Sequence, residues 1–328
     1  MERHEDAVFA PSKLNLDNIE KTIQEAYHQE GPGRPPRNPL GIFKALMTKR
    51  LRQIPSDREL YRRLWNDPLL RMICDIENWE KPYHPSQLTR FRSWVGPERL
   101  ERIIAGLVET LIEGGIIRGE TVAMDATFIK AYSKRDSRDN RRGASDPDAM
   151  VGRDGRTYGL GYKAHIAGDV YSDLPLAFTA APANENEKRH GPTLVERTKM
   201  ILRRAGARLR SLIADSQYSS GRMRGLVDEA VIPFMANQRR GEPVLRVNRK
   251  FRTHGPEEER VEYHKRPAVE AVYAFLKTQY GMAVNKVRGL GSVAVYALYS
   301  VLCHVLTREA AENMGRPDKA LSPTFFNT

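Results

Sequence analysis

The sequence has almost no cysteine. Its only two, Cys74 and Cys303, lie far apart in a chain of 328 residues. Cysteine-based metal sites and disulfide frameworks need several such residues at short spacing, so neither is expected. A chain without disulfides suits a reducing compartment, and we expect the protein to be cytoplasmic.

Long apolar runs are also scarce. The first residues, MERHEDAVF, are charged and no apolar stretch follows them, so no signal peptide is expected. One run, residues 289–307, contains no Asp, Glu, Lys or Arg, but it holds Ser292, Ser300 and His304. It is at the short end of membrane-spanning length. We interpret it as a buried helix packed on a sheet and expect no membrane partner.

Acidic residues are in deficit. The chain has 53 Lys and Arg against 41 Asp and Glu, a formal charge of +12. Such a charge favours a polyanionic partner, with nucleic acid as the first candidate. Ribosomal or membrane-surface binding would fit the same number, so charge alone indicates only a class of partner.

The first third of the chain has a helical pattern. GPGRPPRNP (31–39) predicts a basic linker, because its Pro and Gly content excludes regular structure. Ser56 and Glu59 form a capping-box pattern. A later helix carries SQLTRFRSW, in which Arg90 and Arg92 flank Phe91. We expect residues 1–115 to form an all-helical domain for DNA binding or dimerisation.

After Gly119 the pattern becomes mixed. Apolar or alternating runs predict strands at 121–133, 160–170, 174–182, 211–215 and 231–236. Helical spacing predicts helices at 184–205 and 219–230, with further helices towards the C-terminus. The expected fold is an α/β domain with a mixed sheet over residues 116–310, followed by a tail at 311–328.

Two loops are strongly basic. Residues 130–143 carry six Lys or Arg, beginning with Lys130, against Asp136 and Asp139. Residues 238–252 carry another six, including Arg239 and Arg240, against one Glu. Each loop alone has the composition of a solvated charged segment, but together they indicate phosphate contact.

The stretch Tyr263–Lys277 predicts a helix that begins at Pro267. Helical spacing puts Glu270, Tyr273 and Lys277 on or near one face, with Arg266 just ahead. An ordinary surface helix with Glu–Lys pairing would have the same composition. The alternative is a carboxylate among cations, which suits a phosphate chain and a metal ion.

Two further carboxylates follow apolar strand segments. Asp125 comes after Thr121–Met124, and Asp215 ends Ser211–Ala214. Carboxylates at the ends of adjacent strands can converge, and Glu270 would complete an oxygen cage for Mg²⁺ or Mn²⁺. Two such ions can activate water in phosphodiester hydrolysis. A lone Asp on such a strand is more often a cap or turn residue, and the acids at 257–259 and 262 read as a solvated turn.

These residues carry a family resemblance. Tyr263, Arg266, Glu270 and Lys277 have the spacing of the YREK signature, and the chain resembles DDE transposases of bacterial insertion sequences, the four/five superfamily. MDATFIKA resembles the first Asp block of that family. LIADSQYSS resembles the second, with Tyr218 as the aromatic after the Asp. LGYKAHIAGD and FTAAPANENEKRH resemble the strands between, and SQLTRFRSWVG is similar to the helical N-terminal domain.

The resemblance implies a ribonuclease-H-like core with Asp125, Asp215 and Glu270 as catalytic ligands of two Mg²⁺ or Mn²⁺ ions. It also implies that Tyr263, Arg266 and Lys277 hold DNA phosphates near the cut. Asp215 and Glu270 are 55 positions apart, which leaves no room for a large inserted β domain.

The expected function is therefore binding of terminal inverted repeats, with DNA cleavage and strand transfer. Double-stranded DNA is the expected partner, with a homodimer in the DNA complex and association with the nucleoid. Two alternatives stay open: a DNA-binding protein that has lost catalysis, and a nuclease that cuts without joining.

Overall fold

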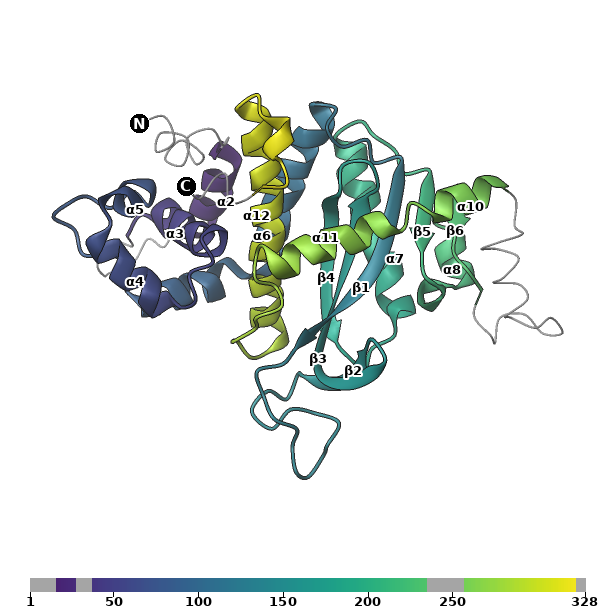
Figure 1. Cartoon of the computed structure of the whole chain (residues 1–328), viewed down its shortest axis with the longest axis horizontal. Helices are drawn as coiled ribbons and strands as arrows, with labels where there is room; N and C mark the ends of the chain where they lie inside the picture. Colours follow the sequence, from purple (N-terminus) through teal and green to yellow (C-terminus); the bar gives the residue numbers. More distant parts are fainter. Residues whose placement is uncertain (1–15, 28–36, 235–256, 323–328) are drawn as a thin grey trace. The chain divides into compact units, whose positions relative to one another are not determined.

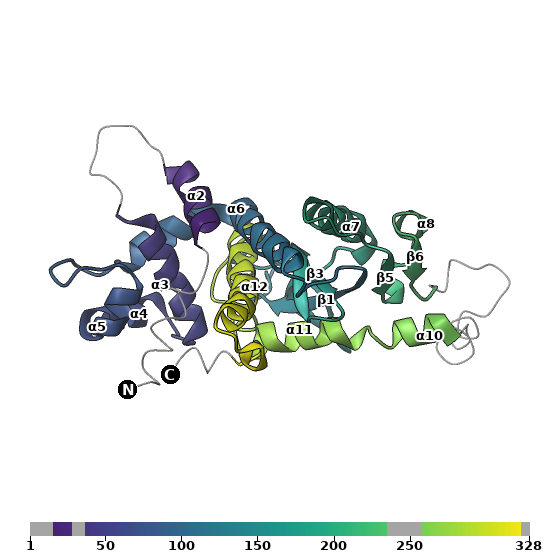
Figure 2. The same ribbon diagram turned by 90° about the horizontal axis from the view of Figure 1, so that it is seen from above.

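The structure, a computed structural model, describes residues 16–27, 37–234 and 257–322 (Figures 1 and 2). The chain forms two compact units. One combines the described residues up to Leu107 with Leu276–Met282 and those from Val295 onward, and the other comprises Val108–Phe275 and Ala283–Ala294. The predicted domains were residues 1–115 and 116–310, whereas the helical unit also takes in C-terminal segments. The division of function between the two domains stays a prediction.

The first unit is helical, as its apolar spacing predicts. Its N-terminal elements are α2 (Asp17–Tyr27), α3 (Pro39–Leu51), α4 (Asp57–Asn66), α5 (Pro68–Ile73) and the start of α6 (Pro85–Glu113). The predicted cap of α4 is present, because the Ser56 side chain accepts a hydrogen bond from Glu59 N at 3.1 Å. Gly96 (φ 65°, ψ 174°) and Pro97 kink α6 where the sequence predicts a helix end.

The apolar run near the C-terminus is a helix, α12 (Leu290–Asn313), followed by the short η4 (Pro317–Lys319). By length and composition α12 could cross a bilayer. However, its most apolar stretch of 18 residues is 78% buried within the protein. From Val295 onward it belongs to the helical unit. The predicted burial is confirmed, and packing on a sheet stays a prediction. Arg50 of α3 donates to Tyr296 O at 2.8 Å and to Tyr280 O at 3.2 Å, which joins these segments.

The second unit is built on a six-stranded mixed sheet. Its strands are β1 (Thr121–Lys130), β2 (Met150–Asp154), β3 (Thr157–Asp169), β4 (Leu174–Pro182), β5 (Ser211–Ala214) and β6 (Glu229–Val231). Strand β3 pairs antiparallel with β1, β2 and β4, whereas β5 is parallel to both β1 and β6. This mixed sheet flanked by helices, with a helical N-terminal region, confirms the predicted α/β fold class; its assignment to a ribonuclease-H-like core stays a prediction.

Two helices cover opposite faces of this sheet (Figures 1 and 2). Helix α7 (Glu187–Arg204) packs on β3 and β4. Helix α11 (Pro267–Thr278) begins at the predicted proline, and its Val269 and Val272 approach Gly168 of β3. The catalytic carboxylates predicted on β1 and α11 are therefore presented to one face of the sheet.

Three elements differ from the sequence prediction. Residues 219–230 form no single helix; η2 (Ser216–Tyr218) and the short α8 (Gly221–Arg224) precede β6. Gly221 and Gly225 delimit α8, since glycine disfavours a longer helix. The acids predicted to form a turn belong to α10 (Glu257–Tyr263), where negative charge suits a helix N-terminus. The strand β2 was not predicted. Of the predicted strand 231–236 only Val231 belongs to β6, residues 232–234 are not in a strand, and the rest lies outside the described residues.

Candidate functional site

The parallel pairing of β1 with β5 brings two predicted carboxylates to neighbouring positions. The last paired residues are Met124 and Ala214, and Asp125 and Asp215 follow them directly. Adjacent strands lie about 4.8 Å apart, so these two residues share one place at the sheet. The sequence predicted carboxylates at the ends of adjacent strands, but Asp125 lies inside β1. It is nevertheless the residue at which the pairing with β5 stops.

The Asp215 side chain is partly engaged by the backbone. It caps η2, and its Oδ1 accepts a hydrogen bond from Gln217 N at 2.9 Å. Burial raises the pKa of Asp215, and the nearby Glu187 carboxylate adds to this, while the Gln217 N–H and the Arg266 guanidinium act in the opposite direction. Burial thus works against a negative charge at this position.

Asp125 is more strongly perturbed. Burial raises its pKa to about 6, and the carboxylates of Asp215 and Glu270 add to the effect, although Arg266 opposes it. Its side chain is only 17% exposed. A carboxylic acid with such a pKa in a basic protein is a candidate functional group with a stated physical cause.

Arg266 connects two of the three predicted acids. Its Nη2 lies 3.0 Å from Asp125 Oδ2, and its Nη1 lies 2.8 Å from Glu270 Oε1, one helical turn along the chain. Glu270 itself is 54% exposed, so this ion pair sits at the edge of the site. One guanidinium therefore balances part of the negative charge that the sequence assigns to a metal cage.

Tyr273 ties α11 to the sheet beneath the acids. Its hydroxyl lies 2.7 Å from Asp125 O and 2.9 Å from Ala164 O and donates to these carbonyls. The ring is buried, and burial raises the pKa of the hydroxyl well above its ordinary value. Helical spacing predicted Tyr273 on or near the face of Glu270, but its contact with the sheet was not predicted.

A second cluster of polar side chains lies on the α7 side of the sheet and was not predicted from the sequence. Lys163 Nζ pairs with Glu187 Oε1 at 2.7 Å, and Glu187 acts electrostatically on Asp215. His165 Nδ1 lies 2.8 Å from the hydroxyl of the buried Tyr218, and burial lowers the pKa of His165 to about 3. The signal was present in the sequence, since Lys163 and His165 are two positions apart in an otherwise apolar strand and so share a face.

The predicted phosphate-contacting residues lie in several places. Tyr263 ends α10 and is half-buried, Lys277 lies half-buried in the last turn of α11, and Lys130 is exposed at the end of β1. Arg239 and Arg240, with the rest of the loop 238–252, lie outside the described residues.

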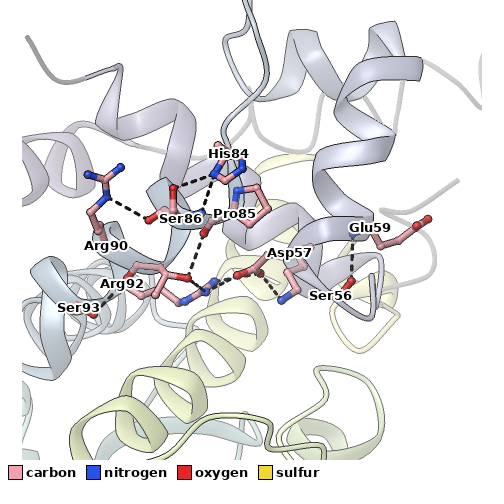
Figure 3. A network of polar contacts seen from close by, with 11 residues as sticks. Ser56, Asp57, Glu59, His84, Pro85, Ser86, Arg90, Arg92 and Ser93 are labelled. Carbon is pink, nitrogen blue, oxygen red and sulfur yellow. Dashed lines mark hydrogen bonds and ion pairs between the residues drawn. The ribbon is translucent and has the colours of Figure 1, made fainter. Parts of the chain in front are cut away.

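Arg90 and Arg92 differ in how their charges are used (Figure 3). Arg92 pairs with Asp57, with Nη1 and Oδ1 3.2 Å apart, and its side chain is 19% exposed. Lys49 pairs with the same carboxylate at 2.6 Å. Burial acts to raise the pKa of Asp57, but these two cations outweigh it and the pKa lies below its ordinary value. Arg90 is exposed and donates only to Ser86 O at 3.4 Å among the described residues.

The donor chemistry of the site fits a hard divalent cation. Asp125, Asp215 and Glu270 present only carboxylate oxygens, which Mg²⁺ and Mn²⁺ prefer. In the part of the chain that the structure describes, no three Asp, Glu, His or Cys side chains are already gathered as a metal-binding group. The Arg266 guanidinium between Asp125 and Glu270 shows that this place already accommodates positive charge.

Two families of known proteins match this chain. A family described as "Transposase DDE domain" matches residues 118–306, and one described as "Transposase domain (DUF772)" matches residues 8–94. A comparison with curated proteins found no match.

Similar solved structures include a piggyBac transposase synaptic complex with hairpin DNA, with 11% identity over 98% of this chain and 80% of that chain and a TM-score of 0.45. Another is a Mos1 transposase paired-end complex with the left transposon end, with 12% identity over 74% of this chain and 82% of that chain and a TM-score of 0.24. These two scores are too low to support an argument. The DDE-domain match covers more than half of the chain, which therefore belongs to the transposase DDE domain family.

Proposed function

We propose that this transposase binds the terminal inverted repeats of an insertion sequence and catalyses metal-dependent DNA cleavage and strand transfer. One observation carries the proposal: the β1–β5 register makes Asp125 and Asp215 neighbours, and Arg266 links Asp125 to Glu270 on α11. Family membership supports nuclease and transesterase chemistry in general, and these acids are the residues that we assign to it.

In this proposal Asp125, Asp215 and Glu270 hold two Mg²⁺ or Mn²⁺ ions. Ions bound there would supply Lewis-acid activation of water and then of the 3′-OH for attack on a phosphodiester, and stabilisation of the leaving oxygen. No covalent protein–DNA intermediate is needed.

Arg266 has two functions in sequence. Before metal and DNA bind, its guanidinium balances the charge of Asp125 and Glu270. A divalent cation held by those carboxylates would compete with the guanidinium for them, and the planar fork of Arg266 suits two oxygens of a phosphate. Arg266 thus stabilises the empty site and then holds DNA near the cut.

The remaining DNA contacts are assigned by exposure and charge. Tyr263 ends α10, Lys277 lies in the last turn of α11, the helix that carries Glu270, and Lys130 and Arg90 are exposed. Arg239, Arg240 and Arg92 stay in the proposed DNA-binding set; for Arg92, binding DNA requires the ion pair with Asp57 to open or to share the phosphate. A homodimer in the complex with transposon ends and target, and association with the nucleoid, complete the proposal.

The test is cleavage and joining of a labelled duplex that carries the element's terminal repeat, with Mg²⁺ or Mn²⁺. We expect cut and joined products from the wild type and none from Asp125→Ala, Asp215→Ala or Glu270→Ala. Each variant should still bind the duplex in EDTA. Glu229→Ala, which changes an exposed acid on β6, is the matched control and should keep full activity.

The alternatives give different products. Binding without cleavage, unchanged by the three substitutions, would leave a DNA-binding protein that has lost catalysis. Cleavage without joined product would leave a nuclease of the same fold.

A further inference from the structure

A basic lobe projects from the sheet beyond β2 and β3 (Figure 1). It consists of residues 130–149 between β1 and β2, the β2–β3 turn with the start of β3 (residues 153–158), and residues 285–289. Its exposed cations are Lys130, Lys134, Arg135, Arg138, Arg141, Arg142, Arg153, Arg156, Lys286 and Arg288. Positive charge of this density on one projection is the electrostatic footprint of a polyanion site.

The lobe is held by a buried anchor. Asp146 is 1% exposed, and its Oδ1 accepts hydrogen bonds from the Tyr162 hydroxyl at 2.6 Å and from Gly289 N at 2.9 Å. Arg135 pairs with Gly143, and Arg142 with Met150, as single antiparallel bridges. The cations are therefore carried on a defined scaffold, which lowers the entropy lost when they bind a ligand.

Most acids of the lobe accept hydrogen bonds from nearby backbone N–H groups. Asp136 Oδ1 accepts from Arg138 N at 2.8 Å, Asp139 Oδ1 accepts from Arg141 N at 3.1 Å, and Asp148 Oδ2 accepts from Leu290 N at 2.9 Å. Asp139 also pairs with the Arg141 side chain at 3.4 Å, but both are exposed, and such a pair is weak. The arginine heads of the tip thus keep most of their charge for an outside ligand.

The lobe begins close to the catalytic acids. Lys130 is five positions after Asp125 on β1, a distance of about 17 Å at the rise of an extended strand. Phosphates of one DNA strand recur every ~3.4 Å along the duplex. Consider DNA that is cut at Asp125 and lies along β1. The phosphate that would reach the start of the lobe is roughly the fifth from the cut.

The side chains favour duplex backbone over single-stranded bases. Two aromatic rings are exposed there, Tyr132 at 53% and Tyr158 at 71%, and Arg288 lies over the Tyr132 ring at 5.2 Å. Sites for single strands rely on successive open aromatic platforms. An excess of cations over rings instead fits phosphate contacts.

We propose that the basic lobe binds the duplex flanking the cleavage point through its phosphates, largely independently of base sequence. The inference rests on the proposed function, because it takes Asp125 as the place of cleavage. It assigns to the lobe the holding of DNA rather than its recognition.

The test is salt-dependent binding of a labelled 30-base-pair duplex of mixed sequence, in EDTA. The variant Arg138→Gln/Arg141→Gln/Arg142→Gln should weaken binding roughly tenfold or more and lower the slope of log K against log salt by about 2.7, three phosphate contacts at ~0.9 each. The matched control is Arg203→Gln/Arg208→Gln/Arg210→Gln, exposed residues by the opposite end of β5, with the same charge change. It should leave the slope unchanged.

A second variant separates charge from structure. Replacing Arg138, Arg141 and Arg142 by Lys keeps the charge and should retain the wild-type slope, while a lobe that merely needs arginine to fold would lose it. Equal losses in the lobe and control variants, or tighter binding of a single strand than of the duplex, would overturn the proposal. Failure of the proposed function shows separately, as wild-type protein that binds DNA through the lobe but does not cut.

Discussion

The balance of charge around Arg266 is the feature on which the site depends at the scale of single residues. Asp125 carries three influences that raise its pKa, namely burial and the carboxylates of Asp215 and Glu270. The Arg266 guanidinium and the backbone N–H of Ala126 oppose them and do not fully compensate. The folded, metal-free protein therefore pays a free-energy cost to ionise Asp125, which a divalent cation would remove.

This cost gives a prediction on stability. The pKa of folded Asp125, about 6, is above its ordinary value of 3.8, so folding favours the protonated form. The contribution of this group to stability is intact below pH 3.8 and is lost as the pH rises through about 6. Asp125→Asn should therefore stabilise the metal-free protein by about 1–3 kcal/mol at pH 8.

The gain should disappear near pH 4, as measured by urea denaturation at both pH values in EDTA. Asp154→Asn serves as the control on an exposed acid and should change little at either pH. A less stable Asp125→Asn variant at pH 8 would mean that the ion pair with Arg266 outweighs burial.

A second prediction concerns Arg266 and metal affinity. The guanidinium lies within 3.0 Å of both Asp125 and Glu270 and competes electrostatically with any cation there. Arg266→Gln should raise the affinity for Mn²⁺ without DNA by about tenfold, measured by electron paramagnetic resonance of free Mn²⁺. Arg135→Gln, with the same charge change on the basic lobe, should shift it much less. Weaker Mn²⁺ binding by Arg266→Gln would show that the guanidinium positions the acids instead.

At the scale of elements, the site depends on how α11 is fixed to the sheet. Arg266 and Glu270 belong to this segment, whereas Asp125 and Asp215 belong to strands. The hydroxyl of Tyr273 bonds to the carbonyls of Asp125 and Ala164, so it links α11 to both β1 and β3. The position of Glu270 relative to Asp125 is thereby set by a buried contact one turn further along the helix.

Removing that hydroxyl should affect both stability and catalysis. We expect Tyr273→Phe to lower the free energy of unfolding by about 1–2 kcal/mol, because a buried hydrogen bond is lost without loss of the ring. The rate of duplex cleavage should fall as well, since Glu270 is held less firmly. Urea denaturation and single-turnover cleavage measure the two effects. Tyr158→Phe, at a ring that is 71% exposed, should change neither; an equal effect of both substitutions would contradict the assignment.

At the scale of the whole molecule, the helical unit is not a contiguous piece of sequence. It combines the N-terminal helices with Leu276–Met282 and the described residues from Val295 onward. Leu298, Leu302 and Val305 of α12 are fully buried. Arg50 needs the carbonyls of Tyr280 and Tyr296 as acceptors.

A fragment of residues 1–115 should therefore fail to fold cooperatively. It retains every N-terminal helix but lacks the apolar face of α12, and it leaves the guanidinium of Arg50 without these acceptors. Thermal unfolding followed by circular dichroism should be broad for the fragment and cooperative for the full chain. A sharp transition and a dispersed amide spectrum of the fragment would show that the N-terminal helices form a domain by themselves.

Local chemistry determined much of this protein. Apolar periodicity predicted β1, β3, β4, β5 and most of α7, and proline and capping residues predicted the starts of α4 and α11. These features depend on neighbours in sequence. The three acids were also named from local context, and their proposed catalysis awaits experiment.

Other features depended on contacts between residues far apart in the chain. The β1–β5 register that makes Asp125 and Asp215 neighbours, the bridge from Arg266 to Asp125, and the burial of α12 in the helical unit join segments separated by 90 residues or more. Periodicity reports which side of an element is apolar, but which partner covers that side is decided by packing, so only the tertiary structure could place these residues together.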